Sequence, residues 1–201
     1  RGVPLDADHG MSSGPDVLVG LLNPYALLGG AALTAVFVLH GLTFLRLKTA
    51  GRLREEAHGV LVPVAGAAVV LGAAFVLWTQ IAHGKPWTWA VTVLALLGVL
   101  GGVAMVLRDR DGIAFTATSV AVVAVTVLIF GSMYPWLMPT TLADGAGLDV
   151  WNAASNPYTL KIMTWAALFI TPLVIAYQAW TYWVFRKRIT AEPVAAEPVA
   201  A

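Results

Sequence analysis

Five stretches of this chain are too long and too apolar to be the core elements of a small soluble domain. They lie near residues 24–47, 60–82, 87–107, 113–137 and 159–185. A helix needs roughly 20 apolar residues to cross about 30 Å of hydrocarbon, and continuous runs satisfy their backbone groups in lipid as helices. We therefore predict an all-α integral membrane bundle with five transmembrane helices.

The composition agrees with this class. Of the 201 residues, 59% are hydrophobic and 11% are charged, whereas soluble domains carry roughly 25% charged residues. The chain has no cysteine, which excludes disulfides and thiolate-bound metals within it. The opening segment RGVPLDADHGMSSGPD lacks the apolar core of a signal peptide. Because the chain begins with Arg1 rather than Met, we expect it to be part of a longer protein.

Lysine and arginine are distributed unevenly among the connections. One side of the predicted membrane holds nine of them: Arg46, Lys48, Arg52, Arg54, Arg108, Arg110, Arg186, Lys187 and Arg188. The other side holds three: Arg1, Lys85 and Lys161. By the positive-inside rule, the nine-residue side is expected to be cytoplasmic, and the N-terminal segment is expected to lie outside.

Ionisable groups deep in the membrane would indicate a proton relay or a cofactor site, but the predicted spans contain no carboxylate. His40 is the one histidine well inside a span, and haem would need a second axial ligand at a similar depth. Met105 and Met133 lie near opposite surfaces, so neither matches. A packing role or a contact with a neighbouring subunit is therefore favoured for His40, which stays a weak cofactor candidate. No catalytic or metal-ligating residue is expected.

Small residues suggest where the helices pack. Gly98 and Gly102 form a GxxxG motif, which lets helices approach closely in lipid, although chance can also produce it in a sequence rich in glycine. Pro172 is expected to kink the last span. Kinks occur in transporters and in static bundles alike, so this feature does not discriminate between them.

The stretch WNAASNPYTLKIMTW, residues 151–165, leads from a polar loop into the last span. Pro157 is expected to open the helix, and Lys161 can extend its ammonium to the surface while its methylenes stay in lipid. We interpret this stretch as a structural helix start and interface. Its candidate residues are Trp151, Asn152, Pro157, Lys161 and Trp165.

Three motifs carry a resemblance to a known family. In order and spacing, LLNPYALLGG, KTAGRLREEA and WNAASNPYTLKIMTW with PLVIAYQAWTYWVF resemble the second half of subunit II of the cytochrome bd-type quinol oxidases. The resemblance covers about residues 1–190. It implies a four-helix bundle over 24–137 and a peripheral helix over 159–188. An outer-face segment over 1–23 and an outer loop over 138–158 would connect them, and the tail 189–201 is expected to be disordered or a remnant of cloning.

The resemblance also implies a role. Subunit II would be a structural subunit without haem in a heterodimer of the bacterial plasma membrane that oxidises quinol and reduces oxygen to water. Haems b558, b595 and d are expected in the partner, subunit I. Other expected contacts are the lipid bilayer and a small accessory membrane subunit, with no nucleic acid. The family's first half of subunit II, with its embedded acidic residues, is absent here, which puts a proton-pathway role in doubt. The alternatives are a transporter or channel domain and a general assembly scaffold.

Overall fold

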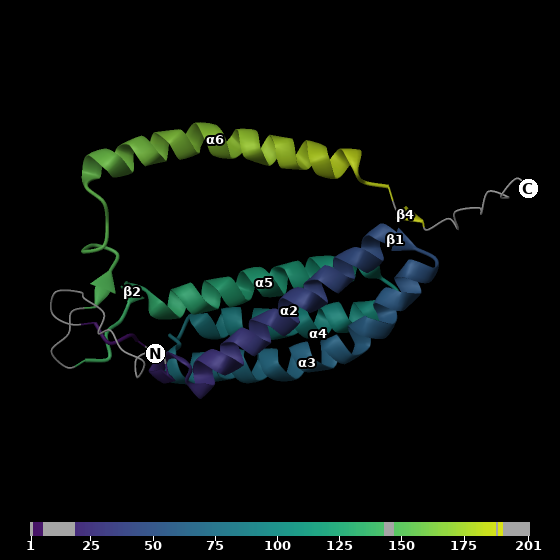
Figure 1. Cartoon of the computed structure of the whole chain (residues 1–201), viewed down its shortest axis with the longest axis horizontal. Coiled ribbons are helices and arrows are strands. Elements are labelled where there is room, and N and C mark those ends of the chain that lie inside the picture. The colour runs from purple at the N-terminus through teal and green to yellow at the C-terminus, as the bar shows by residue number, and fades with distance from the viewer. Residues whose placement is uncertain (1, 6–18, 143–146, 188, 191–201) are drawn as a thin grey trace, which may run out of the picture.

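The computed structural model describes residues 2–5, 19–142, 147–187 and 189–190 of the chain. Five of its helices are long and apolar enough to cross a membrane, which confirms the predicted all-α membrane class. They are α2 (Pro24–Lys48), α3 (Arg52–His83), α4 (Thr88–Leu107), α5 (Asp111–Met133) and α6 (Pro157–Val184). Helices α2 to α5 form one bundle, and α6 lies apart from it (Figure 1).

The two largest differences from the predicted helix boundaries are in α3 and α5. Helix α3 begins at Arg52 instead of near residue 60, because its polar first turns are held by ion pairs to the connection between α4 and α5. Helix α5 ends at Met133 instead of near residue 137, since Pro135 disfavours the helical conformation in Tyr134, whose ψ is 134°.

Small residues form much of the bundle core. Two hydrophobic clusters fill the space between the four helices, and alanines contribute to both of them: Ala32, Ala65, Ala68, Ala95, Ala114, Ala121 and Ala124. Side chains of this size let the helix backbones approach closely, which favours association in lipid. The most extensive packing joins α4 to α5 and α2 to α3.

The two ends of the bundle differ in chemistry. At the end where α2 stops and α3 starts, here called the basic end, Lys48 and several arginines gather. At the other end, here called the far end, α3 turns into α4 and α6 begins.

In the described part of the chain, α6 is joined to the bundle near its two ends. None of its residues is buried. At the far end, β2 (Trp136–Met138) pairs with β3 (Leu148–Asp149) in the loop that leads to α6. At the basic end, β1 (Thr49–Ala50) pairs in parallel with β4 (Ile189–Thr190), which follows α6. The rest of the predicted tail, residues 191–201, lies outside the described residues, as does most of the predicted N-terminal segment.

Candidate functional site

A buried arginine organises the basic end. Arg46 lies in the last turn of α2, and its side chain is 1% exposed. Its Nη2 donates to Oδ1 of Asp109 at 2.9 Å and lies 3.1 Å from Oδ1 of Asp111, in an ionic contact that is not aligned as a hydrogen bond. Its Nη1 lies 2.6 Å from Nδ1 of His58. Because a guanidinium only donates, His58 accepts through Nδ1 and carries its proton on Nε2.

A second arginine completes this cluster from α3. Arg54 donates from Nε to Oδ2 of Asp111 at 3.0 Å, and from Nη2 to Oδ1 of Asp109 at 2.9 Å. The two arginines and two aspartates balance in formal charge. We call Arg46, Arg54, His58, Asp109 and Asp111 the charge cluster. It links α2 and α3 to the connection between α4 and α5.

The backbone places both aspartates. Asp109 has φ of 56°, a left-handed conformation that aspartate tolerates better than most residues. Asp111 is the first residue of α5, where the partial positive charge of the helix N-terminus favours a carboxylate. Its side chain is only 4% exposed. The sequence predicted Asp111 in a loop; α5 instead starts two residues earlier than predicted, and this carboxylate is buried at the end of the bundle.

Electrostatics at the cluster follow from these bonds. The hydrogen bond from Arg54, followed by the one from Arg46, lowers the pKa of Asp109 below its ordinary value of 3.8. The carboxylate is therefore ionised over the physiological range, and its charge stays available to both arginines.

His40 lies between α2 and α5, away from the charge cluster. The hydroxyl of Thr118 donates to the carbonyl of Phe115 at 3.0 Å, so it accepts from Nδ1 of His40, 2.9 Å away. The imidazole also stacks on the ring of Phe115, with centroids 4.8 Å apart. These contacts orient the ring within the helix pair.

Gln80 organises the far end, as Arg46 organises the basic end. Its Oε1 accepts hydrogen bonds from the hydroxyls of Thr88 at 2.8 Å and Thr92 at 3.0 Å. Its Nε2 donates to the carbonyl of Lys85 at 3.2 Å. Since Gln80, Thr88 and Thr92 are all buried, these bonds satisfy polar groups that lipid could not. They close the turn between α3 and α4.

The two candidate glycines lie at the contact of α4 with α5. A Cβ at Gly98 would come within 2.8 Å of Cβ of Ala121, and one at Gly102 within 2.6 Å of Cγ2 of Thr118. Both positions are buried. Close approach of these two helices therefore depends on the absence of side chains at both sites.

The candidate residues around the start of α6 lie on the surface. Asn152 accepts from the backbone N–H of Asp149 through Oδ1, and its Nδ2 donates to the carbonyl of Gly147. Trp151, which is exposed, donates its backbone N–H to Oδ1 of Asp149. These bonds hold the turn that precedes the helix.

The first turns of α6 have a defined start. Asn156 caps the helix by accepting from the backbone N–H of Thr159 at 2.9 Å, and Pro157 is the first helical residue. Lys161 and Trp165 are exposed, and the ring of Trp165 stacks on Phe169. Pro172 lies inside the helix. The structure thus brings none of these residues into contact with His40 or with the charge cluster.

Sequence reasoning missed the charge cluster and the buried Gln80. A signal was present for the cluster: Arg46 with Arg54 and Asp109 with Asp111 flank two connections predicted on the same side of the membrane. Opposite charges on neighbouring connections at one bundle end are candidates for pairing. For Gln80 the signal was a single amide near a span end, which does not identify its partners.

Comparison with known proteins agrees with these features. The family described as cytochrome bd terminal oxidase subunit II matches residues 1–185. Cytochrome bd ubiquinol oxidase subunit 2 of Bacillus subtilis (strain 168) is 31% identical, over 94% of this chain and 57% of that protein. Cytochrome bd-I ubiquinol oxidase subunit 2 of Escherichia coli (strain K12) is 26% identical, over 87% of this chain and 55% of that protein.

A third relative extends the same pattern. The probable cytochrome oxidase subunit 2 of Haemophilus influenzae is 27% identical, over 81% of this chain and 52% of that protein. The chain thus spans about half the length of the curated relatives it matches. The resemblance inferred from the three motifs is confirmed: the chain belongs to the cytochrome bd terminal oxidase subunit II family.

Proposed function

We propose that this chain is a structural subunit, without haem of its own, of a bd-type terminal oxidase that oxidises quinol and reduces oxygen to water. In this role it packs against the haem-bearing subunit I and stabilises the haems there. The names of its relatives, which are subunits of cytochrome bd ubiquinol oxidases, support the proposal.

The observation that carries the structural role is the charge cluster. Arg46 and Arg54 both pair with aspartates of the same chain, so their charges tie helices together at one end of the bundle. Breaking such a buried pair is strongly destabilising, whereas the intact pair is a fixed part of the fold. This arrangement suits a scaffold better than a path along which charge must move.

The surroundings of the described histidines support the assignment of the haems to the partner subunit. Haem iron needs an axial ligand such as His or Met with room for the porphyrin beside it. The ring of His40 is stacked on Phe115 and hydrogen-bonded to Thr118, while His58 and His83 lie near opposite ends of α3. His9 lies outside the described residues. We therefore assign haems b558, b595 and d to the partner, and no catalytic step to this chain.

The proposal also includes an orientation and further contacts. The basic end is assigned to the cytoplasmic face of a bacterial plasma membrane, from the distribution of lysine and arginine. Helices α2 to α5 would act as one unit and α6 as a peripheral helix covered by lipid or by another subunit. The exposed apolar residues along α6, such as Leu173 and Phe169, support this assignment.

Haem quantification with reduced-minus-oxidised spectra tests the proposal. We expect the isolated chain to be colourless, and the complex that co-purifies in mild detergent to show b- and d-type bands with quinol oxidase activity. Stoichiometric haem in the isolated chain, or a full haem complement in subunit I purified without this chain, would overturn it. Solute uptake by vesicles that contain this chain alone would favour a transporter.

A further inference from the structure

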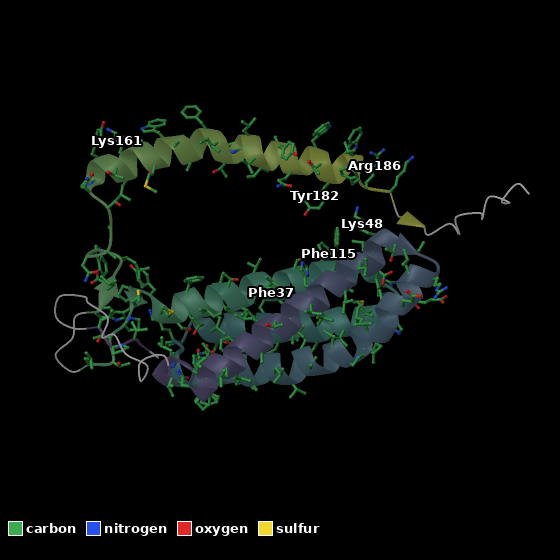
Figure 2. The ribbon with its side chains drawn as sticks, viewed as in Figure 1. Phe37, Lys48, Phe115, Lys161, Tyr182 and Arg186 are labelled. Carbon is green, nitrogen blue, oxygen red and sulfur yellow. The ribbon has the colours of Figure 1, made fainter. Side chains whose placement is uncertain are left out.

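A cavity of about 500 Å³ lies between the basic end of the bundle and the last turns of α6. This volume is within the roughly 300–1,000 Å³ typical of ligand pockets. Its lining includes Phe44 and Lys48 from α2, and Thr181, Tyr182, Phe185 and Lys187 from α6 and the residues that follow it. Figure 2 shows Tyr182 extending from α6 toward the bundle and Lys48 extending from the end of α2 toward α6.

The cavity lining combines apolar side chains with two cationic ones. Aromatic and aliphatic side chains form most of the wall, and the ammonium groups of Lys48 and Lys187 supply two positive charges. None of the described residues that line the cavity carries a carboxylate. Asp109 and Asp111, elsewhere at the basic end, are paired with Arg46 and Arg54 and not with these lysines.

Lys48 also fixes the geometry of the cavity. Its Nζ donates to the backbone carbonyl of Phe185 at 3.1 Å, which joins the end of α2 to the end of α6. An ammonium has three N–H donors, and this bond uses one of them. The position at the ends of membrane-spanning helices is the depth at which lipid headgroups lie.

We propose that this cavity binds an anionic phospholipid. The phosphodiester would lie between the ammonium groups of Lys48 and Lys187, and the upper part of an acyl chain would lie against Phe44, Tyr182 and Phe185. A free phosphate would gain nothing from the apolar wall, and a neutral lipid would gain little from the two lysines. The combination of both features therefore selects a lipid with net negative charge.

Native mass spectrometry of the full chain, with whatever co-purifies in mild detergent, tests this proposal without any readout of haem. The delipidated protein is titrated with phosphatidylglycerol and with phosphatidylcholine of identical acyl chains. We expect tighter binding of phosphatidylglycerol, weakened by about tenfold or more in the double variant Lys48→Gln with Lys187→Gln, since each cation near the headgroup contributes.

The chain offers a matched control. Lys85→Gln with Lys161→Gln also removes two cations, at the far end, and Lys85, like Lys48, donates to a backbone carbonyl, that of Tyr134. This control is expected to keep wild-type affinity. A second variant, Lys48→Arg with Lys187→Arg, keeps both charges and is expected to retain binding. Should the glutamine double variant fail to fold, Lys187→Gln alone, at an exposed position, is expected to weaken binding about threefold or more.

Three results would overturn the proposal. The first is equal affinity for the two lipids. The second is equal loss of binding in both double glutamine variants, which would indicate a general effect of net charge. The third is full competition by glycerol phosphate, which would show that the site recognises a soluble phosphate and makes no use of the acyl chain.

Discussion

The guanidinium of Arg46 lies 2.9 Å from the carboxylate of Asp109, although the Arg46 side chain is 1% exposed and the Asp109 side chain is 73% exposed. One ion pair therefore crosses from the bundle interior to its surface. The buried Asp111, 3.1 Å from the same nitrogen, completes the inner part of this arrangement. Removing the buried cation should matter far more than removing an exposed one, because water cannot replace it.

The first prediction concerns this buried cation. Arg46→Met is expected to lower the free energy of unfolding by about 3 kcal/mol, since buried Asp111 loses one of its two cations. Denaturant unfolding in detergent measures the effect. Arg52→Gln is the control: Arg52 forms an exposed pair with Glu56, and its loss should change stability by less than about 1 kcal/mol. Equal stability of the two variants would contradict the role of Arg46.

The second prediction concerns pH. The folded-state pKa of Asp109 is lowered, so folding favours its ionised form. Its contribution to stability is therefore present above its ordinary value of 3.8 and is lost as the pH falls through the folded-state pKa. Asp109→Asn keeps a residue that tolerates φ of 56° but removes the charge. The gap in Tm between wild type and variant should shrink between about pH 6 and about pH 3. A constant gap would exclude this titration.

The third prediction compares two glycines of α4. Gly98→Ala is expected to destabilise the bundle by about 1–3 kcal/mol, because the new methyl would meet Ala121 at 2.8 Å and the carbonyl of Ala117 at 2.9 Å. Gly101→Ala is the control, since nothing lies within 4 Å of its Cβ position. It should be neutral or stabilising by up to about 1 kcal/mol. Thermal unfolding of both variants measures the two changes in stability. Similar losses of stability in both would argue against close packing of α4 on α5.

The fourth prediction separates packing from ligation at His40. His40→Phe keeps an aromatic ring beside Phe115 but removes the hydrogen bond to Thr118, so stability should fall by about 1 kcal/mol. The haem content of the purified complex is expected to stay unchanged. Loss of one haem per complex, with the protein still folded by circular dichroism, would make His40 a ligand.

The fifth prediction concerns Lys161. This residue is exposed in the first turns of α6, where a cation interacts unfavourably with the helix dipole. Lys161→Met should therefore leave complex yield and oxidase activity unchanged. A clear fall in activity at normal yield would indicate that the amine has a functional role.

Hydrophobic length alone was sufficient to predict the helices. The five apolar runs correspond to α2 to α6, and Pro157 is the first residue of α6, as predicted. These features are local in sequence, so no knowledge of packing was needed. The early start of α3 was missed because residues 52–59 are mostly polar, and the pairing of Arg54 with Asp109 and Asp111 across the bundle was not predicted.

The charge cluster could not be predicted from local sequence features. Arg46 and Asp109 are 63 positions apart, and their contact exists only once four helices have packed. Moreover, the burial of Asp111 depends on where α5 starts, and a difference of two residues was enough to place this carboxylate in a loop. The sequence thus indicated which charges share one bundle end, while their pairing required the three-dimensional structure.

Helix α6 carries 28 residues with none buried, and the strand pairings of the described residues hold it at its two ends. Packing of the bundle and contact of α6 with its surroundings therefore depend on different segments of the chain. Packing of the bundle does not constrain the side chains in the middle of α6, since none of them is buried. The residues suited to that segment are determined by its surroundings. A library of substitutions in the middle of α6 would therefore report on the lipid or the subunit that covers this helix.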